Sequence, residues 1–127
     1  MTMRSQPTVE VELGDQRLAI GLLQIRVLRL LALFGSASAM ADYMGVHTAR
    51  PTEWATGSTP GGSTAALLAD LSFVWERATE DLADEAVRLW LSSANRFLGD
   101  QPLEAIRVGG LAEVLAARDA HLEGSYA

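Results

Sequence analysis

Cysteine and lysine are both missing from this chain of 127 residues. Without cysteine the chain can form no disulfide and has no thiolate for catalysis or metal binding, which fits a reducing compartment, so we expect a cytoplasmic protein. All ten basic residues are arginine, and there are only two histidines, His47 and His121. Neither histidine has a metal-ligating residue three or four positions further on. We therefore expect no metal site.

Motifs for phosphate binding and catalysis are lacking as well. The stretch STPGGST at residues 58–64 has the composition of a phosphate-binding loop but not its pattern. The acidic stretch EDLADE at residues 80–85 lacks the glycine-containing loop of a calcium site, and it suits the first turn of a helix. We expect a protein that is not an enzyme and binds no cofactor.

The longest apolar run, residues 18–35, is interrupted by Gln24, Arg26 and Arg29 at helical spacing. A membrane span is nearly free of charge over about 20 residues, so this pattern predicts a buried helix of a soluble protein and no membrane association. The first residues, MTMRSQPTVEVEL, lack the apolar core of a signal peptide.

Negative charge is concentrated in the second half of the chain. Residues 1–63 have five arginines and five acidic residues, whereas residues 64–127 have five arginines and eleven acidic residues, a net charge of −6. This composition is a poor nucleic-acid surface and a suitable partner for a basic protein. The alternative interpretation is an ordinary solvated helix face.

The chain outside the N-terminal 20 residues is predicted to be all α. The alternation in TVEVEL predicts a strand, which GD at residues 14–15 could turn into a hairpin with QRLAI; alternatively, Gly14 and Asp15 cap a helix that starts near Gln16. In one later helix, from about Glu80 to Leu91, we expect four residues to face inward: Leu82, Ala86, Leu89 and Trp90. Glycine and proline signals place the helices at about residues 22–34, 36–44, 47–56, 63–78, 80–91, 102–108 and 111–123.

Residues 41–60 have the layout of a helix-turn-helix unit. They resemble the Xre-type domain, with six residues on its pattern: Ala41, Gly45, Val46, Trp54, Gly57 and Pro60. Two residues depart from it. Pro51 requires the second helix to start late, near Arg50, and Glu53 places a carboxylate where phosphates would bind. If the unit binds operator DNA, the residues implied are Thr48, Arg50 and Thr52; otherwise it is a scaffold.

The C-terminal part has a more specific pattern, W-L-x-x-x-N-x-x-L-G-x-x-P-L-x-x-I, over Trp90 to Ile106. With the closing stretch LAEVLAARDAHLEGSYA it resembles the toxin-binding domain of the Xre/MbcA/ParS antitoxin family, over about residues 63–127. The resemblance divides the chain into an N-terminal extension (1–20), an Xre-like helix-turn-helix unit (21–62) and a toxin-binding domain (63–127).

This resemblance implies an antitoxin of a type II toxin–antitoxin system. The implied partner is a RES-domain toxin that consumes NAD or transfers ADP-ribose, and whose active site the antitoxin covers. A homodimer within a larger hetero-oligomer and repression of the operon are also implied. The implied toxin-binding residues are Asn95, Arg96, Gly99, Glu123, Gly124, Ser125, Tyr126 and Ala127.

Several alternatives stay open. Asn95 is equally suited to cap the turn that follows it, and residues 124–127 could simply fray. The whole chain could instead be a stand-alone helix-turn-helix transcriptional regulator, or an interaction scaffold with no role at DNA.

Overall fold

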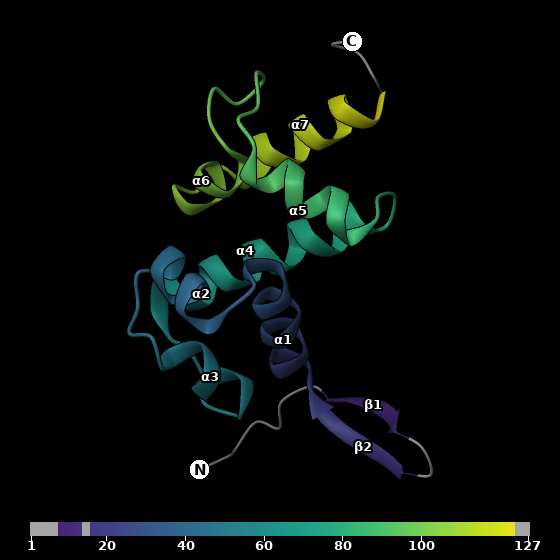
Figure 1. Cartoon of the computed structure of the whole chain (residues 1–127), viewed down its shortest axis with the longest axis vertical. Helices are drawn as coiled ribbons and strands as arrows, with labels where there is room; N and C mark the ends of the chain where they lie inside the picture. Colours follow the sequence, from purple (N-terminus) through teal and green to yellow (C-terminus); the bar gives the residue numbers. More distant parts are fainter. Residues whose placement is uncertain (1–7, 14–15, 124–127) are drawn as a thin grey trace. The chain divides into compact units, whose positions relative to one another are not determined.

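The computed structural model describes residues 8–13 and 16–123, which form seven helices and one pair of strands (Figure 1). The chain divides into two compact units, residues 1–61 and residues 62–127. The all-α fold class predicted from the sequence is confirmed for the part that follows the strands. Each unit has its own core and is described by itself.

The N-terminal unit begins with an antiparallel hairpin. Strand β1 (Thr8–Leu13) pairs with β2 (Gln16–Gly21), and the register runs from Thr8 opposite Gly21 to Leu13 opposite Gln16. The alternative of a helix starting near Gln16 is therefore wrong. Residues 14 and 15, which were expected to make the turn, lie outside the described residues.

Three helices follow: α1 (Leu22–Phe34), α2 (Ala37–Met44) and α3 (Arg50–Ala55). The Ser36 hydroxyl accepts a hydrogen bond from the Ala39 N–H at 3.1 Å and so caps α2; from the sequence, Ser36 and Ser38 are equally suited to this role. Gly45 ends α2 in the left-handed conformation, with φ of 71°, where a side chain would add strain. Two helices joined by a turn that begins at Gly45 thus follow one another at residues 37–55.

The core of this unit lies between its three helices, each of which contacts the other two. Trp54 is 1% exposed and is the largest residue in it. The Gln24 side chain links α1 to the end of α3, because its Nε2 donates to the Ala55 carbonyl at 3.4 Å. The other buried apolar residues are Val27, Leu30, Leu33, Met40, Ala41 and Met44.

Among the described residues, no single helix is both long and apolar enough to cross a membrane. Helices α1 and α2 pass that test only when taken together, and they meet at an angle of 99°. Val27 and Leu30 of α1 are fully buried, as the sequence predicts for a core helix.

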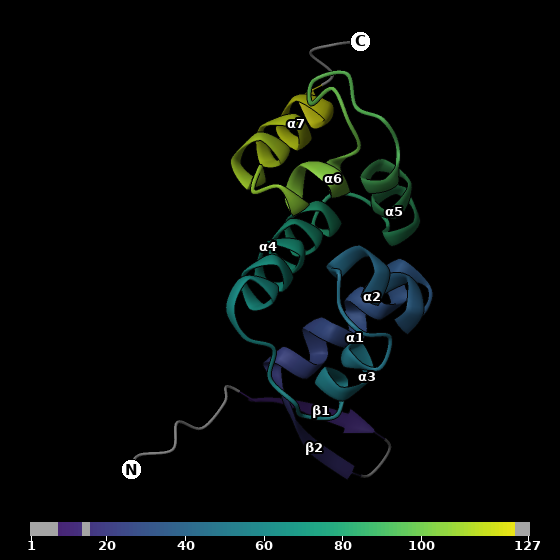
Figure 2. The same ribbon diagram turned by 90° about the vertical axis from the view of Figure 1, so that its left-hand side faces the viewer.

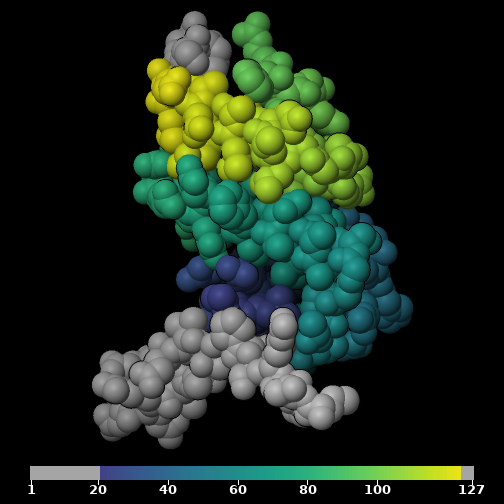
Figure 3. Space-filling model, turned by 180° about the vertical axis from the view of Figure 1, so that it is seen from behind, coloured from purple at the N-terminus to yellow at the C-terminus, as the bar shows by residue number. Residues whose placement is uncertain are grey.

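The C-terminal unit is a four-helix assembly of α4 (Gly62–Thr79), α5 (Asp84–Ser92), α6 (Pro102–Arg107) and α7 (Leu111–Glu123). Helix α4 contacts each of the other three, and α6 and α7 lie side by side along it (Figures 2 and 3). Its buried apolar residues are Leu68, Leu71, Val74, Trp75, Ala78, Val87, Leu91, Pro102, Ile106, Val114 and Ala117.

The buried face of α5 differs from the one predicted. Val87 and Leu91, one turn apart, face the core, whereas Ala86 and Leu89 are exposed. The sequence interpretation began the helix near residue 80, but residues 80–83 form a turn and α5 starts at Asp84. Because a helix advances by 100° per residue, the true inward stripe follows Val87 and Leu91. Leu89, 68% exposed, is left on the surface.

One arginine is buried in this unit. Arg118 of α7 donates through Nη2 to the Arg77 carbonyl at 2.7 Å, and it forms ion pairs with Asp81 and, at 3.1 Å, with Asp119. Its side chain is 7% exposed. These bonds fasten α7 to the end of α4 and to the turn that follows it.

Candidate functional site

The connection between α5 and α6 begins with two serines that end α5. The Ser92 hydroxyl donates to the Arg88 carbonyl at 2.9 Å, and the Ser93 hydroxyl donates to the Leu89 carbonyl at 2.6 Å. The Leu89 carbonyl is one of the last four of the helix, which have no N–H partner in the helix itself. The chain then leaves the helix in an extended conformation at Ser93.

Asn95 closes the loop that follows. Its side-chain oxygen accepts hydrogen bonds from the Phe97 N–H at 2.9 Å and from the Leu98 N–H at 3.1 Å. Its backbone N–H donates to the Asp100 carbonyl at 3.0 Å, and its carbonyl accepts from the Gly99 N–H at 2.8 Å. Asn95 therefore holds the loop through four hydrogen bonds, in the capping role that the sequence analysis gave as an alternative.

Gly99 lets the loop return to its starting point. Its φ is +75°, in the left-handed region that residues with a side chain adopt only with strain. No other described atom lies within 4 Å of the position that a Cβ would occupy. Gly99 is thus required for backbone conformation and not for a close approach.

The loop presents two neighbouring side chains to solvent. Arg96 is exposed, and Phe97 is 61% exposed, which is unusual for an aromatic residue. Pro102 then starts α6 at its first position and is buried, as predicted. Arg96 is among the toxin-binding residues that the family resemblance implies, whereas Phe97 is not.

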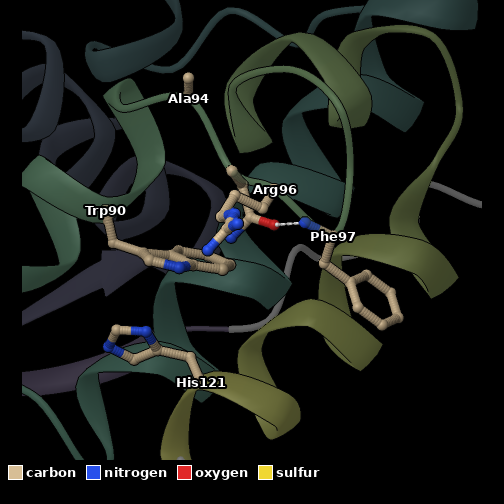
Figure 4. Close-up of a pocket in the computed structure, with 6 residues that line it drawn as sticks. Trp90, Ala94, Arg96, Phe97 and His121 are labelled. Atoms are coloured by element: carbon tan, nitrogen blue, oxygen red, sulfur yellow. Dashed lines mark hydrogen bonds between the residues drawn. The ribbon is translucent and has the colours of Figure 1, made fainter. Parts of the chain in front are cut away.

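A hollow with a volume of about 460 Å³ opens beside this loop (Figure 4). The Trp90 indole of α5 and the His121 imidazole of α7 lie next to each other in its lining, with ring centroids 6.4 Å apart. Phe97 contributes a third ring from the loop. The three rings come from three different segments of the unit, and the residues that line the hollow are Trp90, Ala94, Asn95, Arg96, Phe97 and His121.

Phe97 also borders a second hollow, of about 410 Å³, on the side of α6. Val108, 82% exposed, and Glu113 contribute to its lining. Phe97 therefore stands between two hollows and is accessible to a partner from both. We call the lining residues Trp90, Arg96, Phe97 and His121 the aromatic surface.

The polar atoms of the aromatic surface are not fully paired. The Trp90 Nε1–H is shielded from solvent and has no acceptor among the described residues. Arg96 makes no ion pair within the described part of the chain, whereas Arg88 is paired with Glu85 and Arg107 with Glu104. Unpaired donors beside an apolar hollow are typical of a binding surface.

Sequence reasoning missed three residues of this surface. Trp90 was interpreted as a core residue, but it is only half-buried, and its neighbour Leu91 is the buried one. Phe97 lies in a segment whose glycine and proline predict a turn, and a turn pattern does not indicate which side chains are exposed. His121 was considered only as a metal ligand. The one available signal was the spacing of Val87 and Leu91, which places Trp90 at the edge of the inward stripe.

The proposed C-terminal contact residues are described only in part. Glu123 is exposed at the end of α7, two residues beyond His121. Residues 124–127 lie outside the described part of the chain. The structure thus brings Asn95, Arg96 and Gly99 together in one loop and places Arg96 beside the hollow that His121 lines.

The helix-turn-helix residues have a different environment. Thr48 and Thr52 are exposed at the start of α3 and in its first turn. Arg50 forms an ion pair with Glu53 at 2.9 Å, one turn later on the same helix. As predicted, α3 starts late, which places Pro51 in its first turn. The carboxylate of Glu53 therefore neutralises the one arginine of this helix.

Within residues 8–13 and 16–123, no three histidine, aspartate or glutamate side chains are grouped so that they could hold a metal ion. The described surface that stands out is the aromatic surface.

Comparison with known proteins agrees with this description. No protein-family model and no curated protein matches the chain by sequence. Among solved structures, the chain is similar to a chain in the crystal structure of the M.tuberculosis MbcT-MbcA toxin-antitoxin complex, with a TM-score of 0.67 and 25% sequence identity. The match covers 83% of this chain and 97% of that chain. Together with the pattern from Trp90 to Ile106, it supports membership of the MbcA-like antitoxin family.

Proposed function

We propose that this chain is the antitoxin of an MbcT–MbcA-type toxin–antitoxin system and that it neutralises its toxin by direct binding. The observation that carries this proposal is the structural match to a toxin–antitoxin complex over 83% of the chain. The coverage includes 97% of the matched chain, so the likeness extends to nearly the whole of that protein.

The toxin is proposed to be a RES-domain protein that consumes NAD or transfers ADP-ribose, as the family resemblance implies. Neutralisation then requires only that the antitoxin cover the cleft in which NAD binds. A cleft that holds two phosphates is rich in positive charge, and the C-terminal half of this chain has a net charge of −6. Such complementarity speeds association and fixes orientation more than it adds affinity.

The proposed toxin-binding region is the loop at residues 94–99 together with the end of α7. It combines exposed apolar side chains with an arginine, the kind of composition found at the centres of protein interfaces. Glu123 and residues 124–127 remain proposed contacts. Tyr126 offers a ring and a hydroxyl, a combination common at interfaces.

Co-expression with the toxin gene tests this proposal. A RES-domain reading frame beside this gene, expressed alone, is expected to stop growth and lower cellular NAD. The full chain is expected to restore both and to co-purify with the toxin. If the toxin remains fully active in the presence of an equal amount of folded antitoxin, the proposed function is wrong.

Repression of the operon is a second proposed activity, favoured by the helix-turn-helix geometry of α2 and α3. Contacts to phosphates dominate the affinity of proteins for DNA. Arg50, which could make such a contact, is paired with Glu53. Glu53→Gln is therefore expected to raise affinity for the promoter at physiological salt, and Arg50→Ala to lower it. A mobility-shift titration measures both. A protein that binds its promoter but no toxin would instead be a stand-alone regulator.

We further propose that the chain is a homodimer within a larger complex with its toxin. Light scattering of the free chain and of the complex measures both masses. A monomeric free chain at micromolar concentration would contradict the homodimer.

A further inference from the structure

We propose that the hollow between Trp90, Phe97 and His121 receives an apolar side chain of the toxin, and that a neighbouring toxin carboxylate pairs with Arg96. This inference rests on the proposed function and deepens it, because it names the chemistry that the toxin must present. At this one part of the interface the antitoxin is positive and the toxin negative. In the rest of the interface we expect an acidic antitoxin surface against a basic toxin cleft.

The shape and lining of the hollow suit an anchoring side chain. Its volume of about 460 Å³ falls within the range of about 300–1,000 Å³ that is typical of ligand pockets. The rings of Trp90 and His121 lie next to each other in the lining, and Phe97 lies apart from them on the loop (Figure 4). Interface residues that contribute most to affinity are large apolar or aromatic side chains that fill such hollows on the partner.

Exposed apolar residues also occur on α5 and α7 outside the lining of the hollow. Leu89, 68% exposed, precedes Trp90 on α5, and Leu122, 41% exposed, follows His121 on α7. Apolar area is therefore exposed on these helices beyond the hollow itself. Binding of a single small molecule would leave these side chains in water, whereas a protein partner would cover them.

Two groups of the residues that line the hollow are hydrogen-bond donors, the Trp90 Nε1–H and the Arg96 guanidinium. The Asn95 side-chain oxygen already accepts two backbone hydrogen bonds and is not free to accept a strong third one. The Trp90 Nε1–H is shielded by the chain itself and has no acceptor among the described residues. Arg96 is therefore the donor that an occupant can reach.

The charge at the hollow is positive, in a unit that is otherwise acidic. Four of the five arginines of residues 62–127 are engaged within the described chain: Arg77 over Phe73, Arg88 with Glu85, Arg107 with Glu104, and Arg118 with Asp81 and Asp119. Arg96 is the exception among the described residues, and it is exposed at the edge of the hollow. An unpaired guanidinium on an apolar surface complements a carboxylate, which it can bind through two hydrogen bonds.

Calorimetric titration of each folded variant into an inactive form of the toxin tests the proposal. We expect Phe97→Ala to weaken binding about 30-fold and Arg96→Glu about 100-fold, as at the central residues of protein interfaces. Arg96→Lys keeps the charge and is expected to lose less than tenfold. Arg88→Glu makes the same charge change at an arginine paired with Glu85 and is the matched control, expected to bind within about threefold of the original chain.

A reversal of charge on the toxin identifies the carboxylate. Single Asp→Lys or Glu→Lys changes across the toxin surface are expected to include one that restores binding to Arg96→Glu. The indole N–H resonance of Trp90, assigned by its loss in Trp90→Phe, is expected to shift when the toxin binds, because the occupant lies against the residues that line the hollow.

Three results would overturn the inference. If the original chain binds toxin and both Phe97→Ala and Arg96→Glu bind as it does, the hollow is not occupied, although the proposed function stands. If removal of residues 124–127 alone moves the Trp90 resonance as toxin does, the occupant is this chain's own end. If Phe97→Ala changes the mass of the free protein, the occupant is a second copy. Failure of the original chain to bind any toxin would refute the proposed function itself.

Discussion

The N-terminal unit buries Trp54 in its core, whereas the C-terminal unit uses Trp90 as one wall of an open hollow. The arginines differ in the same sense. Arg50 of the first unit is neutralised by Glu53, while Arg96 of the second makes no ion pair among the described residues. Trp54 and Arg50 are thus engaged within the first unit, whereas Trp90 and Arg96 line a hollow of the second. The second unit also buries a tryptophan, Trp75, so the contrast is between these particular residues and shows that their environment, not their type, leaves them accessible.

The largest expected effect comes from truncating the two tryptophans. Trp54→Ala removes a fully buried ring and is expected to lower the free energy of unfolding by about 3–5 kcal/mol. Trp90→Ala removes a half-buried ring and is expected to cost less than about 2 kcal/mol. Urea unfolding followed by circular dichroism measures both. Equal losses for the two variants would contradict the contrast between the units.

Two leucines of α5 allow a buried and an exposed side chain of the same helix to be compared within the second unit. Leu91→Ala is expected to lower the free energy of unfolding by about 2–5 kcal/mol, because Leu91 is 1% exposed. Leu89→Ala, two residues earlier and 68% exposed, is expected to change it by less than about 0.5 kcal/mol. Thermal unfolding of both variants measures the difference. A larger loss for Leu89→Ala would mean that the inward face of α5 is assigned wrongly.

The buried arginine provides an intermediate effect. Arg118→Met leaves the Arg77 carbonyl and the Asp81 carboxylate without their donor, and we expect a loss of about 1–3 kcal/mol. The expected loss in the free energy of unfolding is smaller than for a fully buried ion pair because Asp81 is about half exposed. Arg88→Met, at an exposed pair, is the control and is expected to cost at most about 1 kcal/mol. Denaturant unfolding distinguishes them, and equal costs would refute the role of Arg118.

The smallest effect compares the two side-chain caps. Asn95→Ala frees the Phe97 and Leu98 N–H groups, and Ser36→Ala frees the Ala39 N–H. Each is expected to cost about 1 kcal/mol. Only Asn95→Ala is expected to weaken toxin binding, because only it loosens the loop that presents Phe97, and Asn95→Asp should restore binding. Amide exchange at residues 97 and 98 reports the loosening, and unchanged exchange would contradict it.

Local signals in the sequence predicted most of the backbone. Ser36, Gly35 and Gly45 mark helix ends through local hydrogen bonds and dihedral angles, so the sequence around each suffices to place them. The face of α5 could not be placed in this way. Leu89 and Leu91 are equally apolar, and only packing against the other helices decides which of them is buried.

The candidate site was predicted only where backbone chemistry marks it. Asn95 and Gly99 follow from the requirements of a tight loop. The hollow depends instead on α7 bringing His121 next to Trp90, 31 positions away in the chain, and no local pattern encodes that contact.

In the loop at residues 95–100, the groups that hold the backbone in place are not the side chains that the loop exposes to solvent. Its hydrogen bonds come from the Asn95 side chain and from the backbone, so the side chains of Arg96 and Phe97 play no part in holding it. Substitutions at these two positions change what the loop contacts while leaving the loop itself intact. Under the proposed function, these two positions would therefore determine which toxin the chain binds, and few mutations would separate related toxin–antitoxin pairs from one another.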